Sequence, residues 1–173
     1  MTDTEKGLGP IVSASHLAEG NVPALSELEF GMILAWHAFE RWMVRCMSAA
    51  GVPGLGPLDV LVLHASNHRA RPKTLADLCL VLNVEDTHLV TYSVRKLEKL
   101  GLVKSGRKGK EKTVSITETG ALACERYGQI RKELLVDTIR DFGLSDESLS
   151  KMAALLRILS GHYGQAARAA ASL

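Results

Sequence analysis

Apolar residues recur every three or four positions in several stretches of this chain, which is the period of an amphipathic α-helix. Ser26 and Glu29 form a capping box at the start of the first stretch, which continues to the segment GVPGLGP. Pro57 opens the next stretch, LDVLVLHASNH, at a position that favours a helix start, and the sequence RARP interrupts it. A second capping box, Thr74 with Asp77, opens LADLCLVLN. The pattern predicts three helices in the first half of the chain.

A fourth helix, predicted over residues 87–100 between an Asp86 cap and Gly101, has two contrasting faces. At 100° per residue, one face is apolar and is expected to pack inward: Leu89, Val90, Val94, Leu97 and Leu100. The opposite face is polar and is expected to point outward: His88, Tyr92, Arg95 and Lys99.

Two short β-prone segments, LVKSG and KTVSIT, follow this helix and are joined by RKGKE, which predicts a β-hairpin with a cationic tip. Arg95 to Lys112 contain eight cations and two anions, so this segment carries +6 in a chain whose net charge is +2. A charge run alone indicates only a solvated face. Here it lies on a hairpin that directly follows an outward-facing polar helix.

Short helix, outward-facing polar helix and basic hairpin are, in that order, typical of a winged helix-turn-helix, in which the second helix enters the DNA major groove and the wing contacts the backbone. Cations at such a wing release counterions from phosphates. The predicted base-reading residues are Thr87, His88, Thr91, Tyr92 and Arg95. The predicted phosphate contacts are Lys99, Lys104, Arg107, Lys108, Lys110 and Lys112.

Two further helices are predicted at the C-terminal end, one capped by Thr117 and running to about Asp141, the other capped by Ser145. Apolar residues on more than one side, as in LLVDTI, need a second surface, which we expect another subunit to supply. The alternative is that these helices fold back on their own domain. The predicted fold class is mainly α with a small β-hairpin wing. We expect a flexible arm over residues 1–25 and a dimerisation helix over 26–56. A winged helix-turn-helix over 57–117 and further dimerisation helices over 118–173 are expected to follow.

Composition agrees with a helical globular protein. The chain is 46% hydrophobic but only 5% aromatic, and it has no apolar run near the length of a membrane span. Its N-terminus, MTDTEKGLGP, is polar, so we expect a cytoplasmic protein. The three cysteines have no CxxC spacing, which favours reduced, buried thiols.

Discrete chemical sites are few. His64 and His68 have a spacing that could hold zinc with Glu40 or Asp59, but two surface histidines explain it as well. Cys46 is either a redox sensor or a core residue. No arrangement of catalytic residues stands out, so we predict no enzyme, no cofactor and no metal.

The sequence resembles the MarR (multiple antibiotic resistance regulator) family of transcriptional regulators. The resemblance rests on four strings in order: LADL at 75–78, VRKLEKLGLV at 94–103, SITETG at 115–120 and LSDESLSKMAALLRIL at 144–159. It implies a homodimer in which the first and last two helices pack across a two-fold axis. The implied partner is a pseudo-palindromic double-stranded DNA operator.

Two features depart from that family. The segment LCLVLNVED is about one helical turn longer than the usual helix-turn connection. The wing has Lys108, Gly109 and Lys110 where the family commonly has an aspartate followed by an arginine. We therefore predict a basic phosphate contact at the wing rather than an ordered minor-groove arginine.

Two function hypotheses follow. The first is a dimeric, sequence-specific DNA-binding regulator, a repressor modulated by a small lipophilic effector. The second is a winged-helix interaction module that binds an acidic protein or RNA. Aromatic residues commonly line small-molecule sites, and the predicted effector cavity comprises Trp36, Phe39, Trp42 and Leu63. Plain dimer core is the alternative for these residues.

Overall fold

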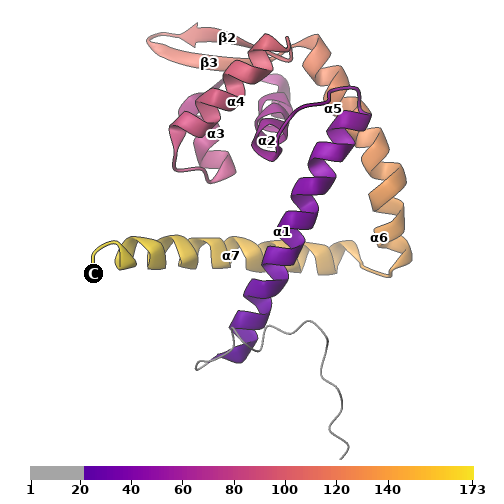
Figure 1. Cartoon of the computed structure of the whole chain (residues 1–173), viewed down its shortest axis with the longest axis vertical. Coiled ribbons are helices and arrows are strands. Elements are labelled where there is room, and N and C mark those ends of the chain that lie inside the picture. Colours follow the sequence, from indigo (N-terminus) through magenta and orange to yellow (C-terminus); the bar gives the residue numbers. More distant parts are fainter. Residues whose placement is uncertain (1–21) are drawn as a thin grey trace, which may run out of the picture. The chain divides into compact units, whose positions relative to one another are not determined.

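The structure, a computed structural model, describes residues 22–173, so most of the predicted N-terminal arm lies outside it. Its described part is mainly helical with one small sheet, as predicted (Figure 1). Two compact units divide the chain, one ending at Tyr127 and the other spanning Gly128–Leu173. The elements are α1 (Pro23–Ala49), α2 (Pro57–Asn67), the 3₁₀ turn η2 (His68–Ala70), β1 (Lys73–Thr74), α3 (Leu75–Leu82), α4 (Thr87–Lys99), β2 (Val103–Lys108), β3 (Glu111–Ile116), α5 (Glu118–Arg131), the π-helical η3 (Lys132–Val136), α6 (Asp137–Asp141) and α7 (Asp146–Ala170).

Helix α1 begins earlier than predicted. The predicted capping box at Ser26 is wrong as a helix start, because the helix already begins at Pro23, and the boundary of the arm at residue 25 moves accordingly. Proline suits the first helical turn because its φ is already helical and its missing N–H would have had no partner there.

Local cap chemistry sets the other helix starts as predicted. The Asp77 carboxylate accepts from the Thr74 N–H at 2.8 Å, and the Thr74 hydroxyl accepts from the Asp77 N–H at 3.1 Å. The Asp86 carboxylate accepts from the His88 N–H at 2.8 Å. At the start of α7, the Ser145 hydroxyl accepts from the Ser148 N–H at 3.1 Å. These bonds satisfy backbone donors that lack a partner within the helix.

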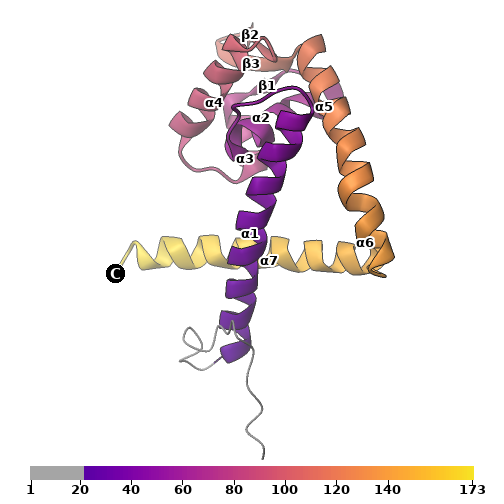
Figure 2. The ribbon, with the colours of Figure 1, turned by 45° about the vertical axis from the view of Figure 1, so that its right-hand side comes forward.

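The core of the first unit is built around α2, which packs against α1, α3, α4 and β3. Its fully buried members include Met47, Val60, Leu63, Leu78, Val90, Leu97 and Val114. Figure 2 shows α2 and α3 beneath the sheet, with α4 alongside. This packing holds α4 against α2 and α3.

The sheet has three antiparallel strands in the order β1-β3-β2. Strand β1 was not predicted, because its two residues are too few to show a period; they pair with Val114 and Thr113 of β3. The pairing of β2 with β3 continues to Lys108 opposite Glu111. The hairpin loop is therefore only Gly109 and Lys110, and most of the predicted RKGKE tip is strand.

A tight turn between α2 and β1 is held by a buried lysine. Arg69 and Ala70 both have positive φ, 59° and 45°, which disfavours residues with a side chain. The Lys73 ammonium donates to the carbonyl oxygens of Ser66, His68 and Arg71 at 3.3, 2.6 and 3.1 Å. Burial lowers the pKa of Lys73. These carbonyl oxygens replace the water that the buried ammonium has lost.

The second unit is helical throughout its main elements. The helix predicted from Thr117 to about Asp141 is present, but a π-helical segment, η3, interrupts it. Every residue of α7 stays at least partly exposed in the single chain, including Met152, Leu155 and Leu156 at 45%, 60% and 48%. An amphipathic helix of this length with no buried residue needs a further surface to cover its apolar side.

Gly120 provides a test of how α5 joins the sheet. A Cβ atom at this position would overlap the Leu102 carbonyl oxygen and lie 2.7 Å from Ile116 Cδ1. We expect Gly120→Ala to lower the free energy of unfolding by about 3 kcal/mol, because backbone cannot easily move aside. The control is Gly128→Ala in the same helix, where nothing lies within 4 Å and a gain of up to about 1 kcal/mol is expected. Urea unfolding measures both, and equal stabilities for the two variants would contradict this packing.

Candidate nucleic-acid interface

Helix α4 has a buried face and an outward face, as its sequence predicted. Val90, Val94 and Leu97 are fully buried, whereas His88 and Arg95 are exposed. Thr87 and Tyr92 are exposed as well, and Thr91 is half-buried with its hydroxyl donating to the Thr87 carbonyl oxygen at 2.8 Å. The five predicted base-reading residues therefore lie along one accessible side of a single helix.

The predicted burial of two leucines was wrong. Leu89 and Leu100 were expected to pack inward, but they are 52% and 48% exposed. The buried arc is instead completed by Ser93, whose small side chain bonds to Asp59. Counting apolar residues missed this position because a buried serine looks polar in the sequence.

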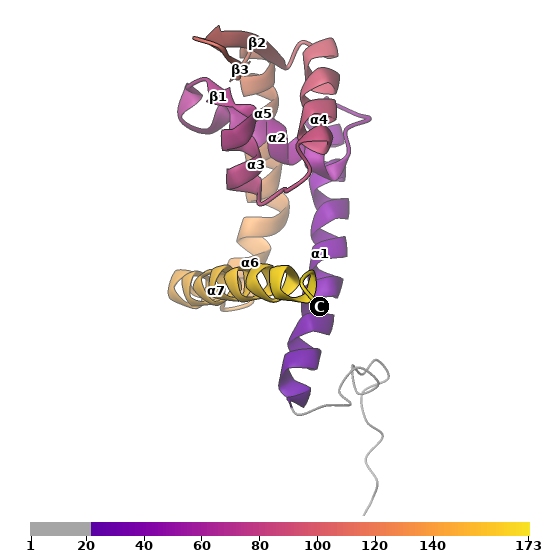
Figure 3. The same ribbon diagram turned by 90° about the vertical axis from the view of Figure 1, so that its left-hand side faces the viewer.

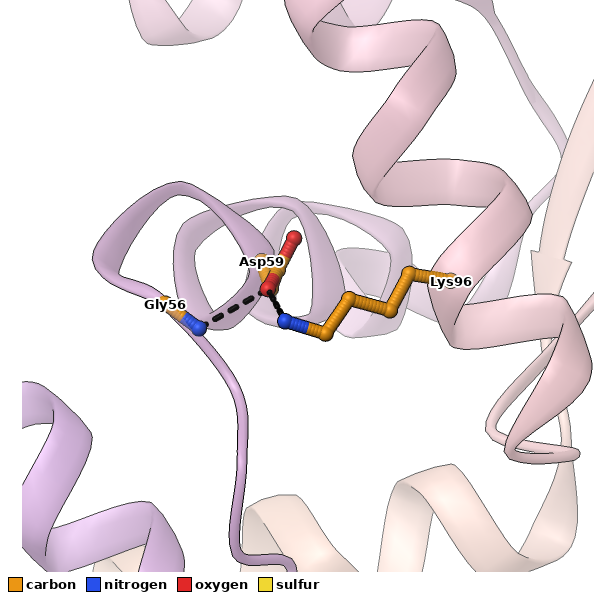
Figure 4. A network of polar contacts seen from close by, with 3 residues as sticks. All are labelled: Gly56, Asp59 and Lys96. Carbon is orange, nitrogen blue, oxygen red and sulfur yellow. Dashed lines mark hydrogen bonds and ion pairs between the residues drawn. The ribbon is translucent and has the colours of Figure 1, made fainter.

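An ion pair joins the start of α2 to α4 (Figure 4). Lys96 Nζ lies 2.7 Å from Asp59 Oδ2, and the same oxygen accepts from the Gly56 N–H at 2.8 Å. The Asp59 side chain is almost fully buried and that of Lys96 is two-thirds buried. Lys96 was one of the cations in the predicted basic run, but its ammonium is paired with Asp59 within the domain. No local signal links two residues 37 positions apart.

The electrostatics of Asp59 follow from this pairing. Burial alone would raise the pKa of its carboxyl, but the hydrogen bonds from Lys96, Gly56 and Ser93, together with the charge of Lys96, outweigh burial. The pKa of Asp59 therefore lies below its ordinary value of 3.8, and the carboxylate stays ionised at neutral pH.

The wing cations lie on two different faces of the hairpin. Cross-strand partners share a face, and successive residues alternate between faces. Arg107 and Lys112 pair with each other and lie on the same face as Val114, which is fully buried. Lys104 and Lys108 lie on the opposite face. The hairpin and α4 are at the same end of the first unit (Figure 3).

The inner face of the wing approaches α4 through one ion pair. Lys112 Nζ lies 3.8 Å from Glu98 Oε2. Glu98 of α4 is thus an acidic neighbour for a wing cation. Beside this pair is a shallow hollow of about 520 Å³. Three of the residues that line it are cations, and the full lining is Ser105, Gly106, Arg107, Lys110 and Lys112. Its charge suits a polyanion.

Residues 55–120 match the family model described as "Winged helix DNA-binding domain". Many solved structures have a similar fold, and three of them come from MarR, NadR and AbfR. MarR from E. coli, in its oxidised form, is 20% identical with a TM-score of 0.59, over 76% of this chain and 93% of that chain. NadR in complex with 4-hydroxyphenylacetate is 19% identical with a TM-score of 0.61, over 76% and 91%. Reduced AbfR bound to DNA is 18% identical with a TM-score of 0.63, over 81% and 96%.

The chain has the winged-helix fold of the MarR-family regulators. A search of curated protein sequences finds no match. The segment that matches the winged-helix model contains α2 to β3 and therefore the Asp59–Lys96 pair, the outward face of α4 and the basic hairpin.

Within this MarR-type fold, the predicted effector residues occupy different environments. Trp36 and Phe39 are nearly half exposed on α1, with ring centroids 6.3 Å apart, whereas Leu63 is fully buried in α2. The indole Nε1 of Trp42 is buried and has no hydrogen-bond partner among residues 22–173. A separate hollow of about 340 Å³ lies on another side of α1, lined by His37, Glu40, Arg41, Val44, Arg45 and Pro57.

His64, Cys46 and Cys124 pack against other residues of the first unit. The ring of His64 packs edge-on against Tyr127 with centroids 4.6 Å apart, and burial lowers the pKa of His64. The Cys46 thiol is buried and donates to the Tyr127 carbonyl oxygen at 3.6 Å. Burial raises the pKa of Cys124 to about 11, so its thiolate form is disfavoured.

Residues 22–173 contain neither a candidate metal cluster nor a helix that could cross a membrane. In this part of the chain, no three His, Cys, Asp or Glu side chains gather to hold a metal ion, and His68 is exposed while Asp59 is paired with Lys96. None of the helices in the same residues has the length and apolar content needed to cross a membrane.

The Asp59–Lys96 pair predicts a pH-dependent stability. Because the pKa of Asp59 is lowered in the folded state, its contribution is fully present above the unfolded value of 3.8 and is lost as the pH falls through the folded-state pKa. We expect Asp59→Asn to cost about 1 to 3 kcal/mol at about pH 7, with the difference from the unmodified protein shrinking towards about pH 3.

Urea unfolding at the two pH values measures this effect. Asp86→Asn is the matched control, because asparagine caps a helix about as well as aspartate, and its effect should be small. A difference between Asp59→Asn and the unmodified protein that is the same at both pH values would show that the ionised carboxylate contributes nothing.

Proposed function

We propose that this protein is a homodimeric, sequence-specific DNA-binding transcriptional regulator that acts as a repressor in the cytoplasm. The observation that carries the proposal is the outward polar face of α4, held beside a cationic wing in the segment that matches a winged helix DNA-binding domain. AbfR, which has a similar fold, has been solved bound to DNA, and this supports the proposal.

The helix and the wing have different roles in this proposal. His88, Tyr92 and Arg95 read base edges in the major groove, and Arg95 is suited to pair with guanine. Thr87 and Thr91 lie beside them. The wing, together with Lys99 at the end of α4, contacts phosphates through Lys104, Arg107, Lys108 and Lys110, with Lys112 shared between phosphate and Glu98.

Dimerisation is proposed from the uncovered apolar surface. Helix α7 has apolar side chains at three- and four-residue spacing that remain partly exposed: Leu149, Met152, Leu156, Leu159 and Tyr163. Helix α1 likewise exposes Leu28, Ile33 and Leu34. We propose that the segments 26–56 and 118–173 cover these surfaces with a second copy and hold two winged domains of residues 57–117 on a pseudo-palindromic operator.

A small lipophilic effector is part of the proposal. NadR has been solved in complex with 4-hydroxyphenylacetate, an aromatic weak acid, and this supports a ligand of that class. The aromatic residues of α1, Trp36, Phe39 and Trp42, are the candidate contacts, and Leu63 of α2 is the fourth candidate.

The division of labour between helix and wing can be measured. If about three of the six cations proposed for phosphate contact in each subunit contact a phosphate at once, Lys108 among them, the dimer neutralises about six phosphates and log K should fall against log salt with a slope of about −5. Lys108→Ala removes two contacts per dimer, so the slope should flatten by about two while specificity survives. Arg95→Ala should instead relax discrimination at one base pair of each half-site, by about 1 to 3 kcal/mol per contact.

The measurement is a salt titration of affinity for a duplex selected from random DNA and for a random duplex. A Lys108 variant that keeps its slope, or an Arg95 variant that weakens equally on both duplexes, would contradict these roles. An unmodified protein that prefers no duplex would reject the regulator proposal and favour an interaction module that binds an acidic protein or RNA.

The dimer surface can be tested on α7. Leu156→Glu puts a charge in the apolar row, and we expect monomers, because burying an unpaired carboxylate is costly. Gln165→Glu adds the same charge nine residues later, on the opposite side of the helix at 100° per residue, and should leave dimers intact. Light scattering after size exclusion gives the masses. A dimeric Leu156→Glu variant would exclude this row from the interface.

The effector prediction is tested by titrating a panel of aromatic weak acids. Binding beside Trp36 and Trp42 should change tryptophan fluorescence and lower operator affinity together. If no compound of a broad panel changes either the tryptophan fluorescence or the operator affinity, these aromatic residues belong to the core of the dimer instead.

A further inference from the structure

Leu89 is the apolar residue that the reading helix leaves uncovered in its first turn. It is 52% exposed, and Tyr92, three residues later, is 70% exposed. Residues three apart on a helix are surface neighbours, so the leucine side chain and the tyrosine ring lie next to each other. Single exposed leucines are common on proteins, but this one lies at the end of α4 that a winged helix directs towards the base pairs.

The exposure of Leu89 is fixed by contacts on both flanks of α4. Lys96 follows Leu89 by seven residues, so it lies on nearly the same flank, and its ammonium is held 2.7 Å from Asp59. Glu98 lies on the other flank and is held 3.8 Å from Lys112 of the wing. Between them, Val90 and Leu97 are completely buried. The helix cannot rotate to cover Leu89 without breaking these contacts.

The polar groups around Leu89 are poorly suited to phosphate. The Thr91 hydroxyl already donates to the Thr87 carbonyl oxygen at 2.8 Å. The Asp86 carboxylate is engaged as the helix cap, accepting from the His88 N–H at 2.8 Å. Both Glu85 and Asp86 are exposed acids, which repel a sugar-phosphate backbone. This end of α4 therefore offers an apolar contact next to negative charge, in contrast to the cationic wing.

We propose that Leu89, with the ring of Tyr92 beside it, reads the C5-methyl group of a thymine in each half-site. Thymine is the one base that presents a methyl group in the major groove, so contact with that methyl group lets an exposed leucine distinguish it from cytosine. The inference rests on the proposed DNA-binding function and adds to it the chemistry that the operator must contain. Leu89 is then a specificity-determining residue alongside Arg95.

The test replaces thymines of a selected operator with uracil, one symmetric pair at a time. Uracil keeps every hydrogen-bonding group of thymine and lacks only the methyl group. For one thymine pair we expect binding by the unmodified dimer to weaken about fourfold per half-site and about 15-fold in total, since burying one methyl group contributes about as much as one CH₂. The Leu89→Ala dimer, which keeps the Tyr92 ring, should lose most of this preference for thymine over uracil.

Leu100→Ala is the matched control, because Leu100 is 48% exposed just after the same helix but far from its first turn. This variant should keep the full thymine preference, and equal thermal unfolding of the three proteins shows that folding is unchanged. The inference is overturned if the unmodified dimer binds all uracil duplexes as tightly as the original, or if Leu89→Ala keeps the preference. A protein that selects no operator at all overturns the proposed function itself, in an earlier and separate measurement.

Discussion

The ion pair between Lys96 and Asp59 fixes the orientation of α4 on α2, and every base contact proposed for α4 depends on that orientation. The apolar packing beneath α4 is non-directional, so by itself it would tolerate a small rotation of the helix. A hydrogen-bonded ion pair does not, because its strength depends on distance and angle. Removing one partner leaves the other partly buried and unpaired, which is far worse than removing both. The ion pair therefore sets the direction in which His88, Tyr92 and Arg95 point from α4.

The wing is held against α4 less tightly than α4 is held against α2. Its single ion pair to α4, from Lys112 to Glu98, is longer and more exposed, and such pairs contribute little to stability. The hairpin is positioned mainly by its strand pairing with β1 and by the burial of Val114. A firmly held reading helix beside a less tightly held cationic arm matches the two tasks proposed for them, since base reading needs exact geometry and phosphate attraction does not.

Much of this fold could be predicted because its signals are local. Capping residues act within three positions, so the starts of α3, α4 and α7 were predicted correctly from Thr74, Asp86 and Ser145. What could not be predicted depends on residues far apart in the chain. The Asp59–Lys96 pair and the two-residue strand β1 exist only once the domain is packed, and the buried Ser93 likewise has its partner, Asp59, in another helix.

The alternation of side chains along the wing limits how this protein can change through evolution. Gly109 and Lys110 alone connect β2 to β3, and an insertion at this loop would lengthen the turn without changing the faces of the strands. A one-residue insertion inside β2 would instead put Lys104 and Lys108, which share a face, on opposite faces unless a bulge takes up the added residue. Substitutions can therefore tune the charge of this wing gradually, whereas an odd insertion within a strand rearranges its faces.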